Sequence, residues 1–375
     1  MALDTLFEHR GYLVDTRRVS KYSAAVGQVI SDGDLVADLG CGFGILGLLC
    51  LKAGAGKVWG IDGTDAIDVA REAMRKNGYS DRYECVHEQT FRAELPEKVD
   101  VIICDHIGYF GIDYGIIQLM HDARQRFLKP GGKIMPERLR LFLAGARSAS
   151  CRGRMSAWET PDVPAEFNWL RSYAVNTKYP VSFAPADIVT EPVLVGGVEL
   201  GDEAPDTLPF KASLVADETG VIDGIAGWFE CDLGGGVTMT NSPLARDRID
   251  RTQIFLGFDE PLAVRAGDTI EVSVRVNHTN SIVAWTVRDP ATGKLQRYTN
   301  WASMPMSVHE RLKPDSSVRE LNGRGRAMKV VIGYIEAGMT SVEIEQAVLQ
   351  NHPDMFPSVQ ETVRFVKDEL ARYCV

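Results

Sequence analysis

The chain has 375 residues, of which 45% are hydrophobic and 25% are charged, and its formal net charge is −10 at pH 7. These values are typical of a globular protein, and the negative charge argues against nucleic acid or an anionic membrane surface as the main partner. No apolar run is long enough to cross a membrane, and residues 1–9 lack the basic and apolar regions of a secretory signal, so we expect a cytoplasmic protein.

Residues 1–135 alternate between helical and strand-like patterns. Residues 1–33 are predicted to be helical, and the segments after them switch between short apolar runs and helix-like periods. Apolar strands separated by helices are typical of a parallel sheet covered on both faces, which predicts a Rossmann-like α/β domain. The predicted strands are 35–38, 57–62, 83–87, 99–105 and 133–135, a turn is predicted over 129–132, and the predicted helices are 45–53, 66–76 and 114–127.

From residue 136 the pattern changes to strand-like segments that are separated by Gly, Pro, Asp and Asn turns. This pattern predicts an all-β, barrel-like domain over 136–305. A helical insert over 160–175 is predicted to project from this domain, within an arm at about 155–180. The predicted strands include 139–144, 225–233, 252–256, 269–276 and 282–288.

The last part of the chain, residues 325–375, is predicted to be a small helical module. Thr340-Ser341-Val342-Glu343 and Ser358-Val359-Gln360-Glu361 are capping boxes that open apolar-periodic helices. The segment 319–326 is interpreted as the linker before this module. The seven cysteines of the chain include no Cys-x-x-Cys pair, and the cysteines and histidines lack zinc spacing, so we expect free thiols and no bound metal.

A glycine-rich turn between the first predicted strand and a helix is the strongest chemical signal. Gly40, Gly42 and Gly44 allow a tight turn and a close approach of the backbone to a ligand. Asp38 precedes the first glycine by two residues, and Asp62 ends the next strand, where an acid accepts hydrogen bonds from ribose hydroxyls. The Gly-x-Gly-x-Gly spacing differs from the dinucleotide fingerprint, and Asp38 suits a cationic amino-acid head. We therefore predict S-adenosyl-L-methionine (SAM) as the cofactor, with a nicotinamide, a flavin or no ligand as alternatives.

Residues 7–303 resemble the protein arginine methyltransferase family. The resemblance is carried by residues 38–46 at the glycine turn, by residues 52–58 and by shorter matches along the chain. The shorter matches are Glu94-Leu95-Pro96, residues 98–103, Gly108-Tyr109, residues 128–132, Gly227-Trp228-Phe229, Ser242-Pro243, residues 258–261 and residues 266–268. The resemblance implies a SAM-dependent methyltransferase with a Rossmann-like domain, a β-barrel-like domain and a homodimer formed through the helical arm.

The resemblance also implies residue roles in cofactor binding. Arg18, in the pattern Asp15-x-x-Arg18-x-x-x-Tyr22, matches the arginine that binds the cofactor carboxylate, and Asp62 matches the ribose-binding acid. Thr90 and Phe91 fall where the family binds adenine. The family's acid aligns there with Phe91, so Glu88 or backbone groups are the alternatives for binding adenine.

The acceptor half of the predicted site departs from the family at three places. The family clamps a guanidinium with two glutamates, whereas the first position here is Asp105 and the second is Tyr114, next to Asp113. The family's Thr-His-Trp loop aligns with Arg248-Ile249-Asp250. Asp105 and Asp113 are the candidate catalytic acids that orient the acceptor, and His106 is the candidate general base because histidine titrates near neutral pH.

Residues 335–344 and 351–373 show a shorter resemblance to PqqD-like winged-helix modules, which hold the leader peptides of ribosomal peptide natural products. This resemblance implies a peptide-binding module, and a structural cap is the alternative.

The altered acceptor loop and the added tail lead to three hypotheses about function. The first is methyl transfer to a nitrogen or oxygen nucleophile of a small-molecule or peptide substrate in specialised metabolism. The second is N-methylation of free or protein arginine, with Asp105 and Asp113 as a compressed clamp. The third is a non-catalytic scaffold or peptide-binding protein that retains the cofactor fold. The sequence leaves the acceptor open.

Overall fold

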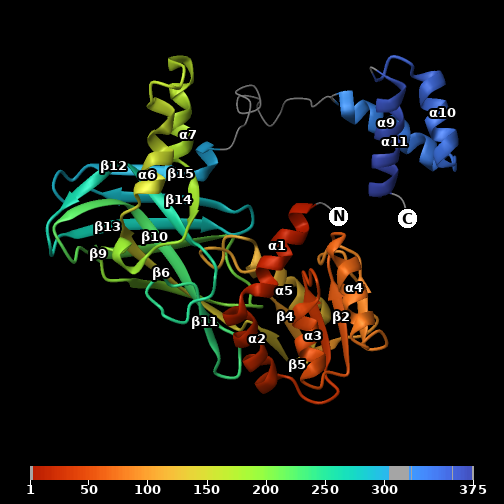
Figure 1. Ribbon diagram of the computed structural model, residues 1–375, viewed down its shortest axis with the longest axis horizontal. Helices are drawn as coiled ribbons and strands as arrows, with labels where there is room; N and C mark the ends of the chain where they lie inside the picture. Colours follow the sequence, from red (N-terminus) through yellow and green to blue (C-terminus); the bar gives the residue numbers. More distant parts are fainter. Residues whose placement is uncertain (1–2, 304–320, 322, 357, 374–375) are drawn as a thin grey trace. The chain divides into compact units, whose positions relative to one another are not determined.

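A computed structural model of the protein describes residues 3–303, 321, 323–356 and 358–373. The chain divides into two compact units, Met1–Met304 and Pro305–Val375, which Figure 1 shows coloured along the sequence. In the part of the chain that the structure describes, no helix is long and apolar enough to cross a membrane.

The first unit begins with a five-stranded parallel sheet in the order β3-β2-β1-β4-β5. Its strands are β1 (Leu35–Leu39), β2 (Lys57–Ile61), β3 (Tyr83–Val86), β4 (Val99–Cys104) and β5 (Leu128–Met135). The predicted Rossmann-like sheet is confirmed. Residues 129–132 lie within the bounds of β5, but they interrupt its pairing, because Val99 pairs with Leu128 and Val101 with Lys133. Gly131 has a φ angle of 79°, so a bulge within the strand stands where the turn was predicted.

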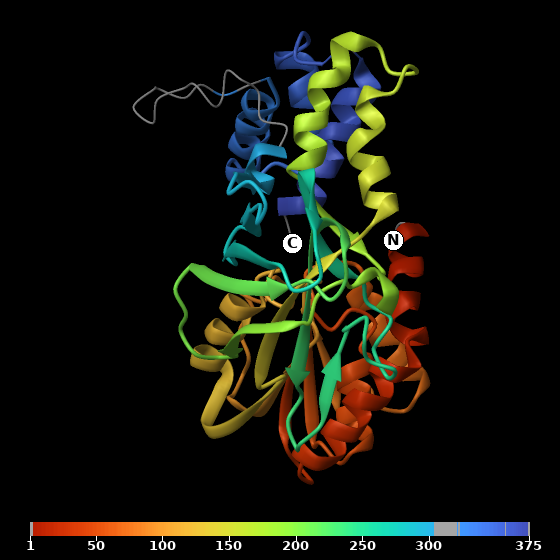
Figure 2. The ribbon, with the colours of Figure 1, turned by 90° about the vertical axis from the view of Figure 1, so that its left-hand side faces the viewer.

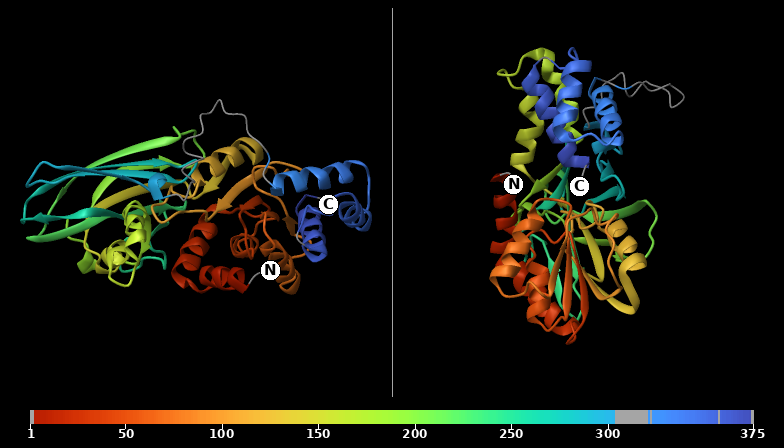
Figure 3. Two further views of the ribbon diagram at one scale, coloured as in Figure 1. Left: turned by 90° about the horizontal axis from the view of Figure 1, so that it is seen from above. Right: turned by 90° about the vertical axis from the view of Figure 1, so that its right-hand side faces the viewer.

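Helices cover both faces of this sheet, as Figure 3 (right) shows. They are α1 (Leu3–Val14), α2 (Thr16–Val29), α3 (Ile45–Lys52), α4 (Ala66–Lys76) and α5 (Ile116–Phe127). Burial explains the apolar runs of the central strands, since the side chains of Val36, Ile102 and Ile103 are fully shielded from water. The arrangement brings the carboxyl ends of the parallel strands to one edge of the sheet.

Two antiparallel sheets follow in the same unit, which confirms the predicted β-rich part. One contains β7 (Lys178–Val181), β12 (Gln253–Val264), β10 (Gly220–Asp232), β6 (Arg138–Ala146) and β8 (Val193–Glu199), in that order, and β11 (Thr238–Thr240) pairs with β10. The other contains β15 (Leu295–Thr299), β14 (Ile282–Arg288), β13 (Thr269–Asn277) and β9 (Thr207–Val215). Their inward side chains share one continuous hydrophobic core with the parallel sheet.

A helical arm leaves the antiparallel sheets between β6 and β7. It contains α6 (Ala149–Ser156), α7 (Arg171–Val175) and short 3-10 turns between them. Figures 1 and 2 show it as yellow-green helices that project beyond the sheets. The arm begins before the predicted insert of 160–175, because the Ser148 side chain accepts a hydrogen bond from the backbone of Cys151 and starts a helix there.

The second unit contains α9 (Gly323–Glu336), α10 (Ser341–Asn351) and α11 (Val359–Tyr373) around a small core of its own. The capping box of Thr340 and Glu343 forms as predicted. The interpretation of 319–326 as a linker was wrong for 323–326, which form the first turn of α9, where Arg324 pairs with Glu369 of α11. The described residues from 321 to 373 contain helices and no strand, so the wing of a winged helix is not observed there. Peptide binding by this unit stays a prediction.

Candidate active site

A cavity of about 650 Å³ lies at the carboxyl edge of the parallel sheet, within the first unit. The turn after β1, the residues that follow β2 and β4, and the inner side of α1 all line it. The residues that contribute are Glu8, His9, Tyr12, Leu13, Arg18, Asp38, Gly40, Cys41, Gly42, Phe43, Ile45, Leu46, Asp62, Gly63, Thr64, Gln89, Thr90, Phe91, Asp105, His106, Tyr114, Gly115, Gln118, Leu119 and Thr279. The cavity thus brings together all the predicted cofactor residues except Gly44, which lies at the end of the turn, together with Asp105 and His106.

The glycine turn favours glycine at all three of its glycine positions. Gly40, Gly42 and Gly44 have φ angles of 61°, 52° and 80°, in the left-handed region that other residues rarely adopt. A Cβ atom on Gly42 would also come within 2.5 Å of the His9 ring, which stacks on Phe43 at a centroid distance of 4.4 Å. Helix α1 therefore packs on the glycine turn through His9, and both His9 and the turn line the cavity.

Asp62 follows β2 and is held in place by the turn. Its Oδ2 accepts a hydrogen bond of 2.9 Å from the Gly42 backbone, and its Oδ1 accepts from the backbone and the hydroxyl of Thr64. The Thr64 hydroxyl can rotate, which would free an acceptor position on the carboxylate for a sugar hydroxyl. The geometry is consistent with the ribose-binding role predicted for Asp62.

Asp38, at the end of β1, is a buried carboxyl with one oxygen unpaired. Its Oδ2 accepts a hydrogen bond of 2.8 Å from the Gly47 backbone, whereas its Oδ1 has no hydrogen-bond partner among the described residues. The nearby Tyr83 hydroxyl is also unpaired, and it acts to lower the pKa of Asp38. Burial raises the pKa of Asp38 to about 7, against the opposing effect of the Gly47 amide. A buried acceptor oxygen that lines the cavity is suited to a cationic group of a ligand.

Arg18 and Asp105 both line the cavity. They lie between the part predicted to bind the cofactor and the part predicted to bind the methyl acceptor. Arg18, on α2, pairs with Asp105 through Nε and donates a hydrogen bond of 3.0 Å to the Tyr12 carbonyl. Asp105 also accepts from Arg251 at 3.2 Å and from the Tyr22 hydroxyl at 3.1 Å. Burial raises the pKa of Asp105, but Arg251 and Arg18 outweigh burial and hold the pKa below its ordinary value. Asp105 is therefore an ionised carboxylate.

Asp113 does not reach the cavity. Its side chain is 0% exposed, its Oδ1 accepts a hydrogen bond of 2.9 Å from the Phe110 backbone, and its Oδ2 faces Lys178 at 3.4 Å. These contacts fix the loop after β4 against the antiparallel sheets, where Phe110 packs edge-on against Phe210. The structure thus does not bring Asp105 and Asp113 together as a clamp, and Asp113 supports the loop instead.

The acceptor half of the cavity is lined by aromatic and neutral side chains. His106 lies beside Asp105, and burial lowers the pKa of His106, which keeps its ring neutral at neutral pH. Tyr114 lines the cavity with 44% of its surface exposed, and its ring contacts Tyr109 and His106 edge-on. Neutral His106 is the group in this half that can take a proton near pH 7.

Several residues of the site carry no local sequence signal. Gln118 of α5 donates a hydrogen bond of 3.0 Å to Thr279, in the β13–β14 turn, and both line the cavity. Gln89 lines the cavity beside Thr90 and Phe91, which are predicted to lie near adenine, whereas Glu88, named as an alternative from sequence, does not line the cavity. Arg251 reaches Asp105 from just before β12, although 146 positions separate the two residues in the sequence.

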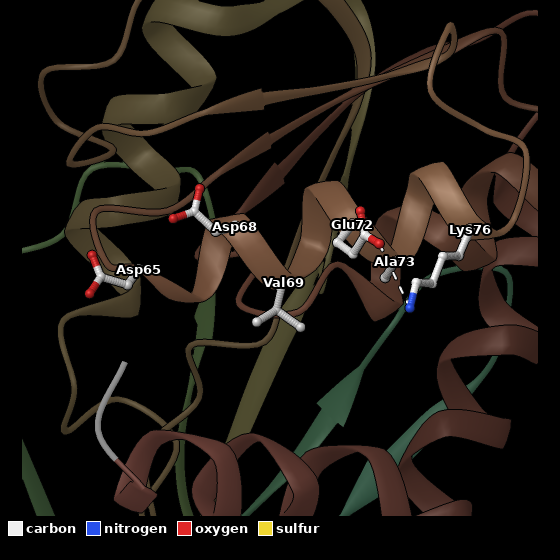
Figure 4. Close-up of a pocket in the computed structure, with 6 residues that line it drawn as sticks. All are labelled: Asp65, Asp68, Val69, Glu72, Ala73 and Lys76. Carbon is white, nitrogen blue, oxygen red and sulfur yellow. Dashed lines mark ion pairs between the residues drawn. The ribbon is translucent and has the colours of Figure 1, made fainter.

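A second depression lies along the outer face of α4, away from this cavity. Figure 4 shows its lining, which consists of α4 residues and the N-cap residue before the helix, namely Asp65, Asp68, Val69, Glu72, Ala73 and Lys76. Glu72 faces Lys76 at 3.7 Å there. Among the described residues, no group of His, Cys, Asp and Glu side chains is arranged to hold a metal ion.

Comparisons with known proteins match this chain to methyltransferases. The model of the ribosomal protein L11 methyltransferase (PrmA) family matches residues 23–136. A probable protein arginine N-methyltransferase 6 of Arabidopsis thaliana is 36% identical over 36% of this chain and 32% of its own length. Protein arginine N-methyltransferase 6 of Danio rerio is 30% identical over 52% of this chain and 54% of its own. The matched segments thus span about a third and about half of these relatives.

Solved structures share the fold over a longer stretch. The Trypanosoma brucei PRMT1 enzyme-prozyme heterotetrameric complex with AdoHcy has a TM-score of 0.69 at 22% identity, and covers 78% of this chain and 97% of its own. Arabidopsis thaliana protein arginine methyltransferase 10 has a TM-score of 0.68 at 22% identity, over 79% of this chain and 98% of its own. At this level of identity the likeness shows the fold.

Proposed function

We propose that this chain, a SAM-dependent methyltransferase with the fold of the protein arginine methyltransferases, methylates a guanidinium nitrogen of arginine in a peptide or protein. One observation carries the proposal: the ionised carboxylate of Asp105 stands at the junction of the cofactor and acceptor halves of the cavity. The position matches the first of the two clamp glutamates. The similarity to protein arginine N-methyltransferases supports arginine over the first hypothesis from sequence, a small-molecule or peptide nucleophile in specialised metabolism.

The cavity fits SAM. The unpaired Oδ1 of Asp38 suits the ammonium of the methionine head, Arg18 suits its carboxylate, and Asp62 suits the ribose. A Cβ atom on Gly40, which lines the cavity, would meet no other atom within 4 Å, so the turn leaves open space there. Bound SAM supplies a methyl group already activated on a sulfonium, so the protein has to align the acceptor and accommodate its proton.

Two residues of this chain act on the methyl acceptor: one orients it and the other takes its proton. Asp105 accepts a hydrogen bond from an N–H of the guanidinium and favours positive charge there. The acceptor nitrogen forms its bond to the methyl carbon as the carbon–sulfur bond breaks in line. The nitrogen then loses a proton, which His106 can take because burial lowers the pKa of His106 and leaves its ring unprotonated at neutral pH.

The test is an assay with SAM labelled in its methyl group. A peptide with a single arginine should be labelled, and hydrolysis should release methylarginine, whereas the same peptide with lysine at that position should not be labelled. SAM binding is measured alongside by calorimetry. Absence of SAM binding would favour the non-catalytic scaffold, and labelling of the lysine peptide alone would exclude arginine as the acceptor.

A second candidate is methyl transfer to a neutral nitrogen or oxygen nucleophile of a small molecule or peptide in specialised metabolism. It is favoured by Asp113, which lies outside the cavity, and by the neutral His106. For such a substrate His106 would be the main base, so His106→Gln should remove activity. The labelled products of the same assay distinguish the two candidates, because an ester, ether or alkylamine is separable from methylarginine.

We expect the affinity for SAM to increase with pH up to about pH 7. Asp38 has a raised pKa of about 7 in the free protein, and the ammonium of SAM favours its ionised form. Below that pH the carboxyl of Asp38 has to lose a proton before it can bind the ammonium of SAM. The Kd for SAM should therefore rise about tenfold for each unit by which the pH is lowered. Calorimetry between about pH 5.5 and 8 measures this, and Asp38→Asn is the control that should abolish the slope. A flat profile for the wild type would contradict the assignment.

We further propose that the arm forms a homodimer. Trp158, Phe167 and Trp169 of the arm are large apolar side chains with exposed surface, and such patches mark interaction sites. Replacement of the most exposed of them, Trp169→Asp, should convert a dimer into a monomer. Sedimentation velocity checks this, and a wild-type protein that sediments as a monomer would refute it.

A further inference from the structure

Arg251 joins the antiparallel part of the first unit to the acceptor carboxylate. It stands two residues before β12, and its guanidinium is buried. Its Nη1 donates a hydrogen bond of 2.8 Å to the Ile107 carbonyl, and its Nη2 donates one of 3.2 Å to Asp105 Oδ2. Arg251 therefore holds both the acceptor carboxylate and the backbone of the loop that follows it.

The segment that contains Arg251 is hydrogen-bonded to α2, the helix that contains Arg18, and to the N-cap residue of that helix. Asp15 accepts from the Arg18 backbone with Oδ1 and from the Asp250 backbone with Oδ2, at 3.0 and 2.9 Å. Arg17 donates to the Arg248 carbonyl at 3.1 Å. The two arginines that contact Asp105 thus lie on segments joined by one hydrogen-bond network, although 233 positions separate them in the sequence.

Counting the acceptor positions of Asp105 shows what Arg251 does to the site. A carboxylate offers about four lone-pair positions. Oδ2 is used twice, by Arg18 and Arg251. The single proton of the Tyr22 hydroxyl can go to Oδ1 or to the Cys104 carbonyl, at 3.1 and 3.0 Å. Because Oδ2 is filled, the carboxylate cannot bind a guanidinium through both oxygens, and Oδ1 is the oxygen with a position left.

We propose that Arg251 is a positioning residue, which occupies Asp105 Oδ2 so that the methyl acceptor binds end-on, through a single N–H or O–H donor to Oδ1. The end-on geometry deepens the proposed function and rests on it for the identity of the acceptor. It explains how the chain works without a second clamp carboxylate: one hydrogen bond orients the nucleophilic atom, and the aromatic wall around Tyr114 confines the rest of the group.

The charged and titratable groups around Asp105 make the proposal testable by titration. These groups are Arg18 and Tyr22 on α2, Tyr12 on α1, His106 and Cys104 beside it, Cys231 on β10 and Arg251 itself. A nearby opposite charge lowers a carboxyl pKa by about 1–3 units. Loss of Arg251 leaves Arg18 as the one cation that contacts Asp105 directly, among the described residues.

The experiment measures the titration of Asp105 in the full-length protein by NMR of aspartate ¹³C-labelled at the side-chain carboxyl. The Asp105 resonance is identified by its loss in Asp105→Asn. Arg251→Gln should raise the Asp105 midpoint by about 1 unit or more. Arg251→Lys keeps the charge and should restore at least half of the shift. The control, Arg248→Gln, removes an arginine of the same segment that contacts the Phe183 and Pro243 carbonyls, and should leave the midpoint unchanged.

The pH–rate profile of the wild type and these variants supplies the second readout. With an acceptor that the wild type methylates, the acid limb of kcat for Arg251→Gln should move by the same amount as the Asp105 midpoint. An unchanged Asp105 midpoint in Arg251→Gln, or an equal shift in Arg248→Gln, would overturn the positioning role, whatever the acceptor. A shifted midpoint with no arginine methylation would refute the proposed acceptor and leave the positioning of Asp105 established. If Arg251→Gln fails to fold, Arg251→Lys and Arg251→Met are compared instead. The Asp105 midpoint should be higher in Arg251→Met, which removes the positive charge, than in Arg251→Lys, which keeps it.

Discussion

Replacement of Asp105 by asparagine is expected to reduce methyl transfer by about a hundred- to a thousandfold while SAM still binds. The carboxylate is the one acidic group that reaches the acceptor end of the cavity from the β4 edge, among the described residues, and asparagine keeps its shape but not its charge. Radiolabelled transfer under saturating SAM measures the loss, and calorimetry measures the retained cofactor binding.

The same substitution is expected to destabilise the protein strongly. It leaves the guanidinium groups of Arg18 and Arg251 buried without their counter-ion, which typically costs about 3–5 kcal/mol. Because the pKa of Asp105 is lowered on folding, its stabilising contribution is complete above the unfolded pKa of about 4 and is lost as the pH falls through the folded pKa. The difference in unfolding free energy between wild type and Asp105→Asn should therefore be large at pH 7 and shrink below about pH 4.

Asp113→Asn is the matched comparison, because it removes the same charge from the same loop. Its expected effect is mainly on stability, through the contacts to Phe110 and Lys178, with most of the transfer rate retained. Equal loss of transfer in both variants, with both proteins folded, would restore the paired carboxylates predicted from sequence and contradict the single-carboxylate site. Unchanged transfer in Asp105→Asn would exclude Asp105 from the chemistry altogether.

The parts of the fold that sequence predicts well are those that local chemistry determines. The strand, glycine turn and helix at 35–52 follow from an apolar run, glycines with positive φ and a helical period. The alternation of buried and exposed residues along β13, predicted as 269–276, is readable in the same way, as is the capping box of Thr340 and Glu343. In each case the residues that interact are within a few positions of one another.

The acceptor half of the site depends on contacts between distant parts of the chain. Arg251 and Asp105 are 146 positions apart, and Gln118 and Thr279 are 161 apart. No period or spacing links such pairs, because the packing of the antiparallel sheets on the parallel sheet decides which side chains meet. The inward position of Asp113 has the same origin, since the loop that carries it is fixed by Phe110 in the shared core. Alignment to a family supplies a position for Asp113 and cannot supply its orientation.

At the cofactor end, Asp62→Ala is expected to weaken SAM binding by about a hundredfold. The substitution removes the charged acceptor for ribose hydroxyls, and hydrogen bonds to charged groups are worth about 1.5–3 kcal/mol each, where 1.4 kcal/mol corresponds to a factor of ten. It also leaves the Gly42 backbone and Thr64 without the oxygens that hold the turn. Calorimetry with SAM and with its demethylated product gives Kd for both. Asp68→Ala is the control, because it removes an equal charge from the outer face of α4, where Asp68 pairs with Arg71, and should leave Kd within about twofold of wild type. An equal loss in both variants would mean that general electrostatics govern cofactor binding, and would remove Asp62 from the ribose contact.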